Sequence, residues 1–383
     1  MGNKRVLIYC PVFLPQTTGY THAFEQLITN LLQGGFIVDV LTPQILGVGE
    51  AEPFVAKNLN IFRYKPTLKV WGLGLFYEFY KQAQFISKFN QQHAYQLVFI
   101  ETGDVPLLPF FLSEFILKKT VVRFHSTSDT EYLHLGNHKK YKLRRWFWRY
   151  LSGNKIKHIC ATNQYHLDYA LNNVLHQPKL KSKYIVTNTI DVNAIDLTQK
   201  VARLTFVMLG RMDEEGYKQK GFDVLLKALP LIKDDMVAAN AEMVIIGEGS
   251  KYSKFKLLIE QYGFVTLNPN LPHQQLLALL QQSHVVLLPS LYEGVSIFAL
   301  EALANANAVI FSKTGGLIEM VNDNGLLVEP GNAVHLADAI RKLIQHSNLV
   351  MLQKKSQQIA QSCFSKEIQL KQFEQLMREI ELC

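Results

Sequence analysis

The sequence predicts an α/β protein with two tandem domains, each a doubly wound parallel sheet. Three observations predict this class: a length of 383 residues, a 48% hydrophobic content, and short apolar runs that alternate with longer helical patterns. With 19% charged residues and no low-complexity segment, the composition excludes a disordered chain. The most apolar longer stretch, 97–117, contains Glu101, Asp104 and Glu114, so we predict no transmembrane helix.

The short apolar runs are the expected strands of each domain. In the first half they lie at residues 5–10, 36–41, 97–101, 120–124, 157–161 and 184–187. In the second half they lie at residues 203–209, 242–247, 264–267, 284–288, 308–311 and 325–328. The pattern lapses between Asp191 and Arg203, which predicts domains at 1–195 and 196–350, followed by helices at 351–383. Ligands of such folds bind at the carboxyl ends of the strands, so the cleft between two domains is the expected site.

The positive charge is confined to the first half of the chain. Residues 1–195 carry 22 Lys+Arg and 12 Asp+Glu, a net charge of +10. Residues 196–383 carry 18 and 20, a net charge of −2, and the two values add to the +8 of the whole chain. Such an excess suits nucleic acid, an anionic membrane or an acidic substrate. The four cysteines form no C-x-x-C pair, so we expect a cytoplasmic protein without a disulfide framework or a zinc site.

The most informative segment follows a predicted strand and reads PSLYEGVSIFALEALA. Glu293 stands near the strand end, and Glu301 is expected about two turns inside the next helix, roughly 12 Å further on at 1.5 Å per residue. The start of this helix offers the amides of Ser296, Ile297 and Phe298, where a diphosphate could bind. Glu301 suits ribose hydroxyls. Two glutamates at this spacing, taken alone, are more typical of a capped helix with solvated side chains.

A second segment, 203–232, places two cations at the same edge of the sheet. Arg211 follows a strand, and Lys220 directly precedes an amphipathic helix. Together they could neutralise a departing diphosphate. Taken alone, the two residues are equally compatible with an ordinary solvated loop.

In their order, these motifs resemble those of the retaining glycosyltransferases of family 4, which have the GT-B fold of two facing Rossmann-like domains. The matching segments are GR and KG around Arg211 and Lys220, IIGEGS at 245–250, LPSLYEG at 288–294, TGG at 314–316 and NGLLVEPGN at 324–332. The resemblance implies that Arg211 and Lys220 bind the donor diphosphate, together with the amides of residues 296–298. It also implies that Glu293 contacts the donor sugar and that Glu301 holds the ribose.

The first half resembles the same family more loosely. Gly19 lies where the family's glycine loop approaches the donor phosphate and the acceptor, but the usual pair of glycines is here Gly19-Tyr20. His125 follows a strand directly and matches the family's histidine that touches the donor sugar; outside the family, a lone histidine is more often structural. Thr189 stands where the family commonly has glycine. The resemblance also implies that the helices at 351–383 return to the N-terminal domain.

The resemblance implies a retaining hexosyltransferase of the EC 2.4 class, with a nucleotide-sugar donor that most commonly carries uridine. No D-x-D motif follows a strand, so we expect neither a metal requirement nor another cofactor. Arg211, Lys220 and a helix terminus would stabilise the departing diphosphate instead. The hypothesis is front-face transfer with retention, in which Glu293 and His125 orient the sugar and the departing phosphate oxygen takes the acceptor proton.

The stretch 138–150 is basic and aromatic, with six Lys/Arg, five aromatic residues and no acid. Its cations and Trp146 fall at helical spacing, and residues 65–90 add a second segment of this kind. Such a helix can lie on an anionic membrane, so we expect a peripheral location on the cytoplasmic face. A packed helix with a solvated basic face is an equally open alternative. No nucleic-acid motif accompanies the segment, so we expect no nucleic-acid partner.

The sequence therefore predicts a glycosyltransferase that acts on a glycan or lipid-linked acceptor in cell-surface polysaccharide or glycolipid biosynthesis, with a UDP-sugar as the expected donor. Two other functions stay open. An epimerase of the same architecture would act on its nucleotide sugar without an acceptor, although the order of the motifs favours transfer. A catalytically silent protein would bind nucleotide or glycan without turnover, although it would not require the four residues Arg211, Lys220, Glu293 and Glu301.

Overall fold

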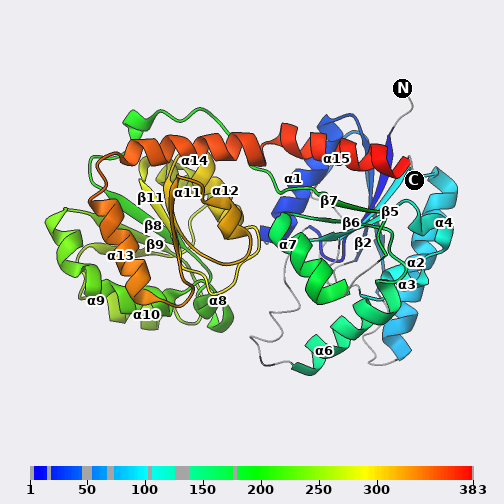
Figure 1. Cartoon of the computed structure of the whole chain (residues 1–383), viewed down its shortest axis with the longest axis horizontal. Coiled ribbons are helices and arrows are strands. Elements are labelled where there is room, and N and C mark those ends of the chain that lie inside the picture. Colours follow the sequence, from blue (N-terminus) through cyan, green and yellow to red (C-terminus); the bar gives the residue numbers. More distant parts are fainter. Residues whose placement is uncertain are drawn as a thin grey trace. The chain divides into compact units, whose positions relative to one another are not determined.

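The computed structural model describes residues 4–14, 19–44, 54–66, 73–101, 106–125, 136, 138–175 and 179–381. The chain divides into two compact units, Met1–Thr189 with Lys366–Cys383, and Ile190–Ser365. Each unit holds one parallel sheet with helices on both faces (Figure 1). The predicted fold class, two doubly wound α/β domains in one chain, is therefore confirmed.

The sheet of the first unit has seven parallel strands in the order β3-β2-β1-β4-β5-β6-β7. They are β1 (Arg5–Tyr9), β2 (Ile37–Pro43), β3 (Leu59–Tyr64), β4 (Leu97–Glu101), β5 (Thr120–Phe124), β6 (His158–Ala161) and β7 (Ser182–Ile185). The sequence pattern misses β3 because this strand lies at the sheet edge with most of its residues half-exposed. It therefore lacks the continuous apolar run of a strand covered on both faces.

The helices of the first unit cover the two faces of this sheet. They are α1 (Gly19–Gln33), α2 (Leu73–His93), α3 (Leu108–Phe111), α4 (Glu114–Leu117), α6 (His138–Phe147), the π-helical η1 (Trp148–Ser152), α7 (Gln164–Tyr169), the π-helical η2 (Ala170–Leu175) and α15 (Lys366–Glu381). One face packs on α1 and α15, through residues such as Leu27 and Leu376. The other packs on α2, α6 and α7, through residues such as Ile86 and Trp148.

The sheet of the second unit has six parallel strands in the order β10-β9-β8-β11-β12-β13. They are β8 (Thr205–Leu209), β9 (Glu242–Ile246), β10 (Val265–Asn268), β11 (Val285–Leu288), β12 (Ala308–Ser312) and β13 (Gly325–Val328). All twelve predicted strands lie within two residues of observed ones. Their near-continuous apolar character follows from burial on both faces of the sheet.

Helices also cover both faces of the second sheet. They are η3 (Leu197–Gln199), α8 (Glu214–Gln219), α9 (Phe222–Ala238), α10 (Tyr252–Ile259), α11 (His273–Gln282), α12 (Ile297–Ala304), η4 (Gly315–Met320), α13 (Ala333–Ile344) and α14 (Leu349–Phe364). One face packs on α9, α10 and α13, with Leu225 and Ile340 in its core. The other packs on α11, α12 and α14, with Leu300 and Ile359 in its core.

The last two helices belong to different units. Helix α14 lies in the second unit and α15 in the first, with Ser365 between them. Phe364 of α14 is buried beside the second sheet, whereas Phe373 of α15 packs on Phe36 with ring centroids 5.6 Å apart. The predicted segment 351–383 is thus divided between the two units, and only its second helix joins the N-terminal half.

In each sheet the order of the strands reverses at one point, between β1 and β4 in the first and between β8 and β11 in the second. Crossover helices on either side of such a switch point diverge, so the carboxyl ends of its strands form the ligand-binding edge. The loops that follow β1, β4 and β5, and those that follow β8 and β11, are therefore where site residues are expected. Within the described residues, no helix combines the length and the apolar character needed to cross a bilayer.

Candidate active site

The second unit brings Lys220 and Glu293 into direct contact at its switch point. Lys220 Nζ lies 2.5 Å from Glu293 Oε2, although 73 residues separate the two along the chain. Ser290 Oγ donates to the same oxygen at 3.3 Å, and the Gly294 amide donates to Glu293 Oε1 at 3.3 Å. The side chains of Lys220 and Glu293 are 17% and 9% exposed, so the pair is mostly enclosed but reachable from solvent.

Two glycines allow the loop after β8 to meet the end of β11. A Cβ atom on Gly210 would lie 2.7 Å from Cγ of Lys220 and 3.1 Å from the ring of Phe222. Gly221 has φ +75°, and a Cβ atom there would lie 2.1 Å from the carbonyl oxygen of Pro289. The glycines of the G-R and K-G motifs therefore leave room for the lysine stem and for the close approach of two backbones.

The loop that carries Glu293 is also held from the side of β12. Gly315, in the T-G-G motif, has φ +53°, and a Cβ atom there would lie 1.8 Å from the carbonyl oxygen of Glu293. The neighbouring Gly316 amide donates to the carbonyl of Gly294 at 3.2 Å. Only glycine allows the T-G-G motif to pack this closely on the backbone of Glu293, and this contact holds the loop that carries the carboxylate.

Arg211 lies at the same edge of the sheet with a more exposed side chain. This side chain is 60% exposed, and its Nη1 lies 3.4 Å from Asp213 Oδ2. The backbone beside it is fixed, because the Met212 amide donates to the carbonyl of Glu248 at 2.8 Å. Arg211 is therefore anchored at its backbone while its charge stays within reach of a ligand in solution.

Helix α12 begins later than the sequence indicates. Ser296 is its N-cap, and the Ser296 hydroxyl accepts a hydrogen bond from the amide of Ala299 at 3.4 Å. The helix geometry leaves the amides of Ile297 and Phe298 without an intrahelical partner, as expected for an anion site. Since residues 293–296 form the loop and the cap, Glu301 lies just over one turn into the helix, and the predicted two turns are wrong.

Glu301 is a buried carboxylate with a histidine partner. It is only 4% exposed, so the alternative of a solvated Glu301 side chain is wrong. Its Oε1 lies 2.7 Å from Nε2 of His273, which begins α11 and whose side chain is 56% exposed. The sequence gives no sign of His273, because the contact depends on how α11 packs beside α12.

The first unit brings His125 to a buried carboxylate that the sequence does not single out. Nδ1 of His125, directly after β5, lies 2.5 Å from Oε1 of Glu101, the last residue of β4. Oε2 of Glu101 lies 3.3 Å from Nη1 of Arg123. Burial alone would raise the pKa of Glu101, but Arg123 and His125 outweigh it and hold this pKa below its usual value. One sequence signal could have pointed to Glu101: it ends a predicted strand, and His125 directly follows the next predicted strand.

Tyr20 covers the other side of His125. Its ring centroid lies 4.6 Å from that of His125, and its hydroxyl lies 3.4 Å from Sγ of Cys10 at the end of β1. Burial raises the pKa of Tyr20 and that of Cys10, the latter to about 12, so both groups are neutral near pH 7. Gly19 is exposed at the start of α1, whereas residues 15–18 of the predicted glycine loop lie outside the described residues.

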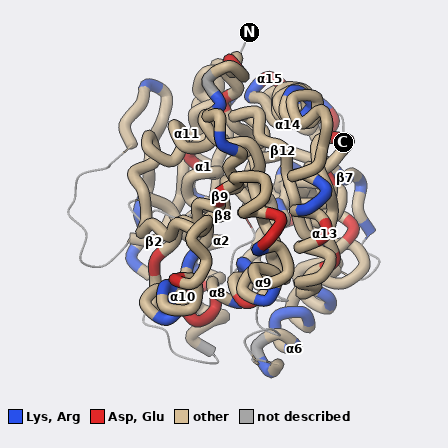
Figure 2. Tube along the Cα trace, turned by 90° about the vertical axis from the view of Figure 1, so that its left-hand side faces the viewer, with Lys and Arg blue, Asp and Glu red and all other residues tan. Residues whose placement is uncertain are grey.

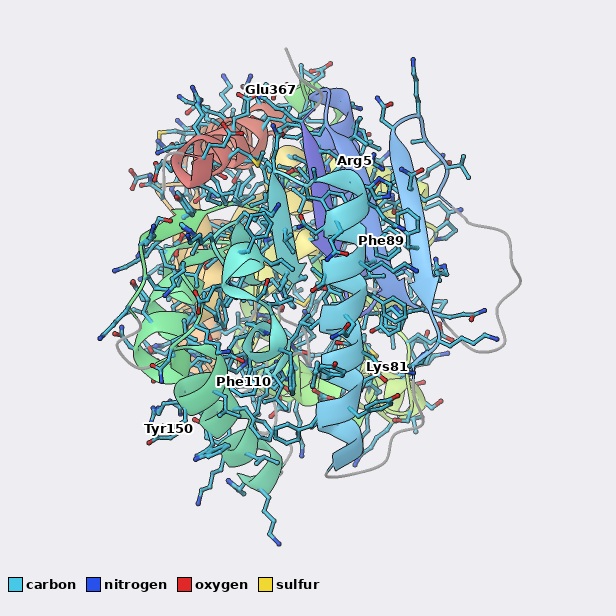
Figure 3. All side chains as sticks on the ribbon, turned by 90° about the vertical axis from the view of Figure 1, so that its right-hand side faces the viewer. Arg5, Lys81, Phe89, Phe110, Tyr150 and Glu367 are labelled. Carbon is cyan, nitrogen blue, oxygen red and sulfur yellow. The ribbon has the colours of Figure 1, made fainter. Side chains whose placement is uncertain are left out.

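The basic aromatic segment 138–150 forms α6 and most of η1. Phe147 and Trp148 are 7% and 2% exposed and belong to the core of the first unit. Trp146 and Tyr150 are 48% and 57% exposed, and Tyr150 projects outward in Figure 3. Lys and Arg gather along α6 in Figure 2. The segment is therefore packed on one face and carries aromatic and basic side chains on the other.

Exposed and half-exposed side chains of this segment line a shallow pocket of about 260 Å³. Its lining residues are Tyr141, Lys142, Arg145, Trp146, Arg149 and Tyr150, and we call them the α6 surface. In the second predicted segment, 65–90, Tyr77 and Tyr80 of α2 are 53% and 46% exposed. Residues 67–72 of that segment lie outside the described residues. Among the described residues, no three His, Cys, Asp or Glu side chains gather so as to hold a metal ion, and metal independence stays a prediction.

Comparison with known proteins gives the family of the second unit. Residues 195–361 match the family model of the glycosyl transferases group 1. The second unit carries a glycosyl transferases group 1 domain. An uncharacterized glycosyltransferase of Methanocaldococcus jannaschii is 30% identical over 216 residues, which cover 54% of each chain. The chain spans from a third to about half of the length of the first curated relatives that it matches, 33% of one and 54% of the other.

Solved structures extend the likeness to the whole fold. Sucrose-phosphate synthase from Thermosynechococcus elongatus superposes with a TM-score of 0.72 at 18% identity, over 99% of this chain and 100% of that one. The Anabaena protein HepE, solved in complex with UDP, gives a TM-score of 0.69 at 15% identity, over 98% and 100%. At these identities the likeness establishes the fold, which is the GT-B fold.

Proposed function

We propose that this protein is a retaining glycosyltransferase that moves a sugar from a UDP-sugar to a glycan or lipid-linked acceptor. The Lys220–Glu293 pair carries the proposal, because it lies at the switch point of a domain that matches the glycosyl transferases group 1. Support for a uridine donor comes from the likeness of the fold to HepE, which was solved with UDP. We also propose that the protein acts in the biosynthesis of a cell-surface polysaccharide or glycolipid.

In the proposed reaction, the donor diphosphate competes with Glu293 for the ammonium group of Lys220. Lys220 turns toward the diphosphate, and Arg211 and the first amides of α12 supply further donors. Glu293 then orients the sugar. Ribose hydroxyls take the place of His273 at the carboxylate of Glu301. The scheme uses no metal ion or cofactor.

Transfer proceeds on one face of the sugar. The bond between the anomeric carbon and the phosphate oxygen breaks with its electron pair staying on the diphosphate. The acceptor oxygen forms the new bond on the same face, and its proton passes to the departing phosphate oxygen. Lys220 and Arg211 stabilise the charge that develops on the diphosphate, the role for which preorganised cations are most effective.

The test is release of nucleoside diphosphate from a panel of UDP-, GDP- and ADP-sugars, each with and without candidate glycan or lipid-linked acceptors. We expect UDP release that an acceptor stimulates, and an α-linked product from an α-linked donor by NMR. Conversion of the donor sugar without an acceptor would support the epimerase instead. Donor binding without release under every condition would support the silent protein and contradict the proposal.

We also propose that the α6 surface docks this protein on an anionic membrane at its cytoplasmic face. Trp146 and Tyr150 offer exposed aromatic rings, and Lys142 and Arg149 stand beside them in the same pocket. Aromatic side chains that are apolar at one end favour the membrane interface, and each nearby cation contributes about 1 kcal/mol on anionic lipid. The +10 net charge of residues 1–195 acts in the same direction.

Co-sedimentation with vesicles of phosphatidylglycerol and phosphatidylcholine tests the docking. Lys139 lies exposed on α6, next to the α6 surface. Combined Lys139→Gln and Lys142→Gln should weaken binding by about tenfold or more, since two cations near the membrane are lost. The matched control is combined Lys227→Gln and Lys233→Gln, which removes two exposed cations from α9 in the second unit. Equal binding of the wild type and the first variant would contradict the docking.

A further inference from the structure

Glu101 and His125 form a pair whose geometry has a chemical consequence. Glu101 lies opposite Arg123 in the register of β4 and β5, and His125 follows two positions further on. Arg123 lies on the strand and His125 directly after it, and both side chains contact the carboxylate of Glu101. The Glu101 side chain is completely buried, whereas that of His125 is 19% exposed. Of this group, the histidine therefore reaches the ligand-binding edge of the sheet.

The two oxygens of Glu101 have separate partners. Oε1 lies 2.5 Å from Nδ1 of His125, and Oε2 lies 3.3 Å from Nη1 of Arg123. Arg123 is also held independently, since its Nη2 donates to the carbonyl of Val186 at 3.2 Å and to Oδ1 of Asn188 at 2.8 Å. The arginine thus fixes the position of the carboxylate, and the carboxylate in turn fixes the position of the imidazole.

A carboxylate oxygen offers only lone pairs, so a ring nitrogen that lies 2.5 Å from it must carry a proton, and this nitrogen is Nδ1 of His125. In the neutral ring, Nε2 is then an acceptor, because a neutral imidazole carries only one proton on its two nitrogens. Tyr20 covers one side of the imidazole, with ring centroids 4.6 Å apart, and limits the orientation of the ring. His125 therefore offers a fixed hydrogen-bond acceptor at the switch point.

We propose that Glu101 is a positioning residue that fixes the Nδ1–H tautomer of His125, so that Nε2 accepts a hydrogen bond from a hydroxyl of the donor sugar. The part that concerns the sugar rests on the proposed function; the part that concerns the tautomer does not. A site built to accept from one hydroxyl discriminates strongly against an analogue that lacks it. The pair thereby selects donors by a single hydroxyl.

The substitution Glu101→Gln tests this inference, because glutamine has one acceptor and one donor group where glutamate has two acceptors. One of the two partners must then accept a hydrogen bond instead of donating one. Arg123 cannot lose its proton, so His125 must change, with Nδ1 becoming the acceptor and the proton moving to Nε2. The variant should therefore invert the tautomer that the wild type has.

The measurement is the two-bond ¹H–¹⁵N NMR spectrum of histidine-labelled full-length protein at about pH 8.5, two pH units above the pKa of a histidine side chain in a model peptide. The His125 signals are assigned with His125→Gln. We expect the Nδ1–H tautomer in the wild type and the Nε2–H tautomer in Glu101→Gln. An Nε2–H tautomer in the wild type, or the same tautomer in both proteins, would overturn the proposal.

Asp39→Asn is the matched control for the loss of a buried carboxylate. Asp39 on β2 is completely buried, lies 2.8 Å from Nη2 of Arg5 and accepts from the hydroxyl of Tyr95 at 2.5 Å. Strand β1 separates β2 from β4 in the sheet. Both variants should lower the melting temperature, but Asp39→Asn should leave the tautomer of His125 unchanged. A changed tautomer in this control would mean that the effect is a general loss of structure, which contradicts a specific role of Glu101.

Kinetics supply the second arm of the test. With the best donor, Glu101→Gln should lower kcat by about tenfold, the effect of one hydrogen bond, with little change in the KM for the donor. One monodeoxy analogue of that donor should be a poor substrate for the wild type and should lose nothing further in the variant. A full additional loss for every analogue would contradict the hydroxyl contact. The NMR arm needs no substrate, so it decides the tautomer even for a chain that transfers no sugar.

Discussion

The two switch points hold their carboxylates in different ways. In the second unit, Glu293 pairs with Lys220 where both side chains are still partly exposed, at 9% and 17%. In the first unit, Glu101 and its partner Arg123 are 0% and 2% exposed. A pair that solvent can reach is able to exchange partners with a charged ligand, whereas an enclosed pair cannot. We therefore propose that the second site binds an anion and that the first holds His125 in place.

The largest effect is expected at the exchangeable pair. Lys220→Ala or Glu293→Ala should lower turnover by about 10² to 10³, because each removes a preorganised group at the reaction centre. Lys218→Ala and Glu329→Gln are matched controls, since both residues are exposed in the same unit. Steady-state kinetics with the best donor measure the loss. A decrease of only a few-fold in both site variants would remove these residues from the proposed mechanism.

The glycine under Glu293 should matter next. In Gly315→Ala, the new Cβ atom would lie 1.8 Å from the carbonyl oxygen of Glu293, so the loop must move. We expect a loss of more than about 3 kcal/mol in the free energy of unfolding of the second unit, together with low activity. In Gly35→Ala the residue also has positive φ, but nothing lies within 4 Å of the new atom.

Gly35→Ala should therefore lower the free energy of unfolding of the first unit by only about 1 kcal/mol, the strain of the positive φ alone. Chemical denaturation, followed separately for the two units, gives both values. Equal losses in the two glycine variants would show that contact with the Glu293 loop is not what the T-G-G motif provides.

A pH effect should test the burial of His166 in the first unit. Burial lowers the pKa of His166, on α7, to about 3, with His125 and Arg123 adding to the shift. The unfolded chain has a histidine pKa of about 6.5, so it binds the extra proton between these two values. The stability of the first unit should thus fall as the pH falls from about 6.5 toward 3.

His166→Gln should flatten this dependence, whereas His335→Gln, at an exposed position on α13, should not. The full contribution is on the order of a few kcal/mol, and part of it is already lost by pH 5. Thermal melts between pH 4 and pH 7 measure it. The account of His166 fails if the slope of the wild type persists in His166→Gln.

The sequence is most informative where a motif packs on another motif. The family resemblance names both Lys220 and Glu293. In the structure, glycines at 210, 221 and 315 of the same motifs let their loops meet. The strands are predictable because burial on both faces leaves continuous apolar runs. The half-exposed edge strand β3 has no such run and is missed.

Partners that meet only through tertiary packing are not predictable in this way. Glu101 interrupts an apolar run and is read from the sequence only as a charge that excludes a membrane span. Its role depends on the register of β4 with β5, which puts it opposite Arg123. His273 likewise reaches Glu301 only because α11 packs beside α12. The expected two turns before Glu301 are wrong because Ser296 caps the helix and delays its start.

We propose a division of labour in which the second unit binds the nucleotide and the first orients the sugar. Titration calorimetry with UDP on Lys220→Ala and His125→Ala tests it most directly. We predict that Lys220→Ala raises the Kd for UDP by about tenfold or more, the loss of one charge-assisted contact, and that His125→Ala leaves it within twofold of the wild type. A Kd that rises equally in both variants, or only in His125→Ala, would contradict the account.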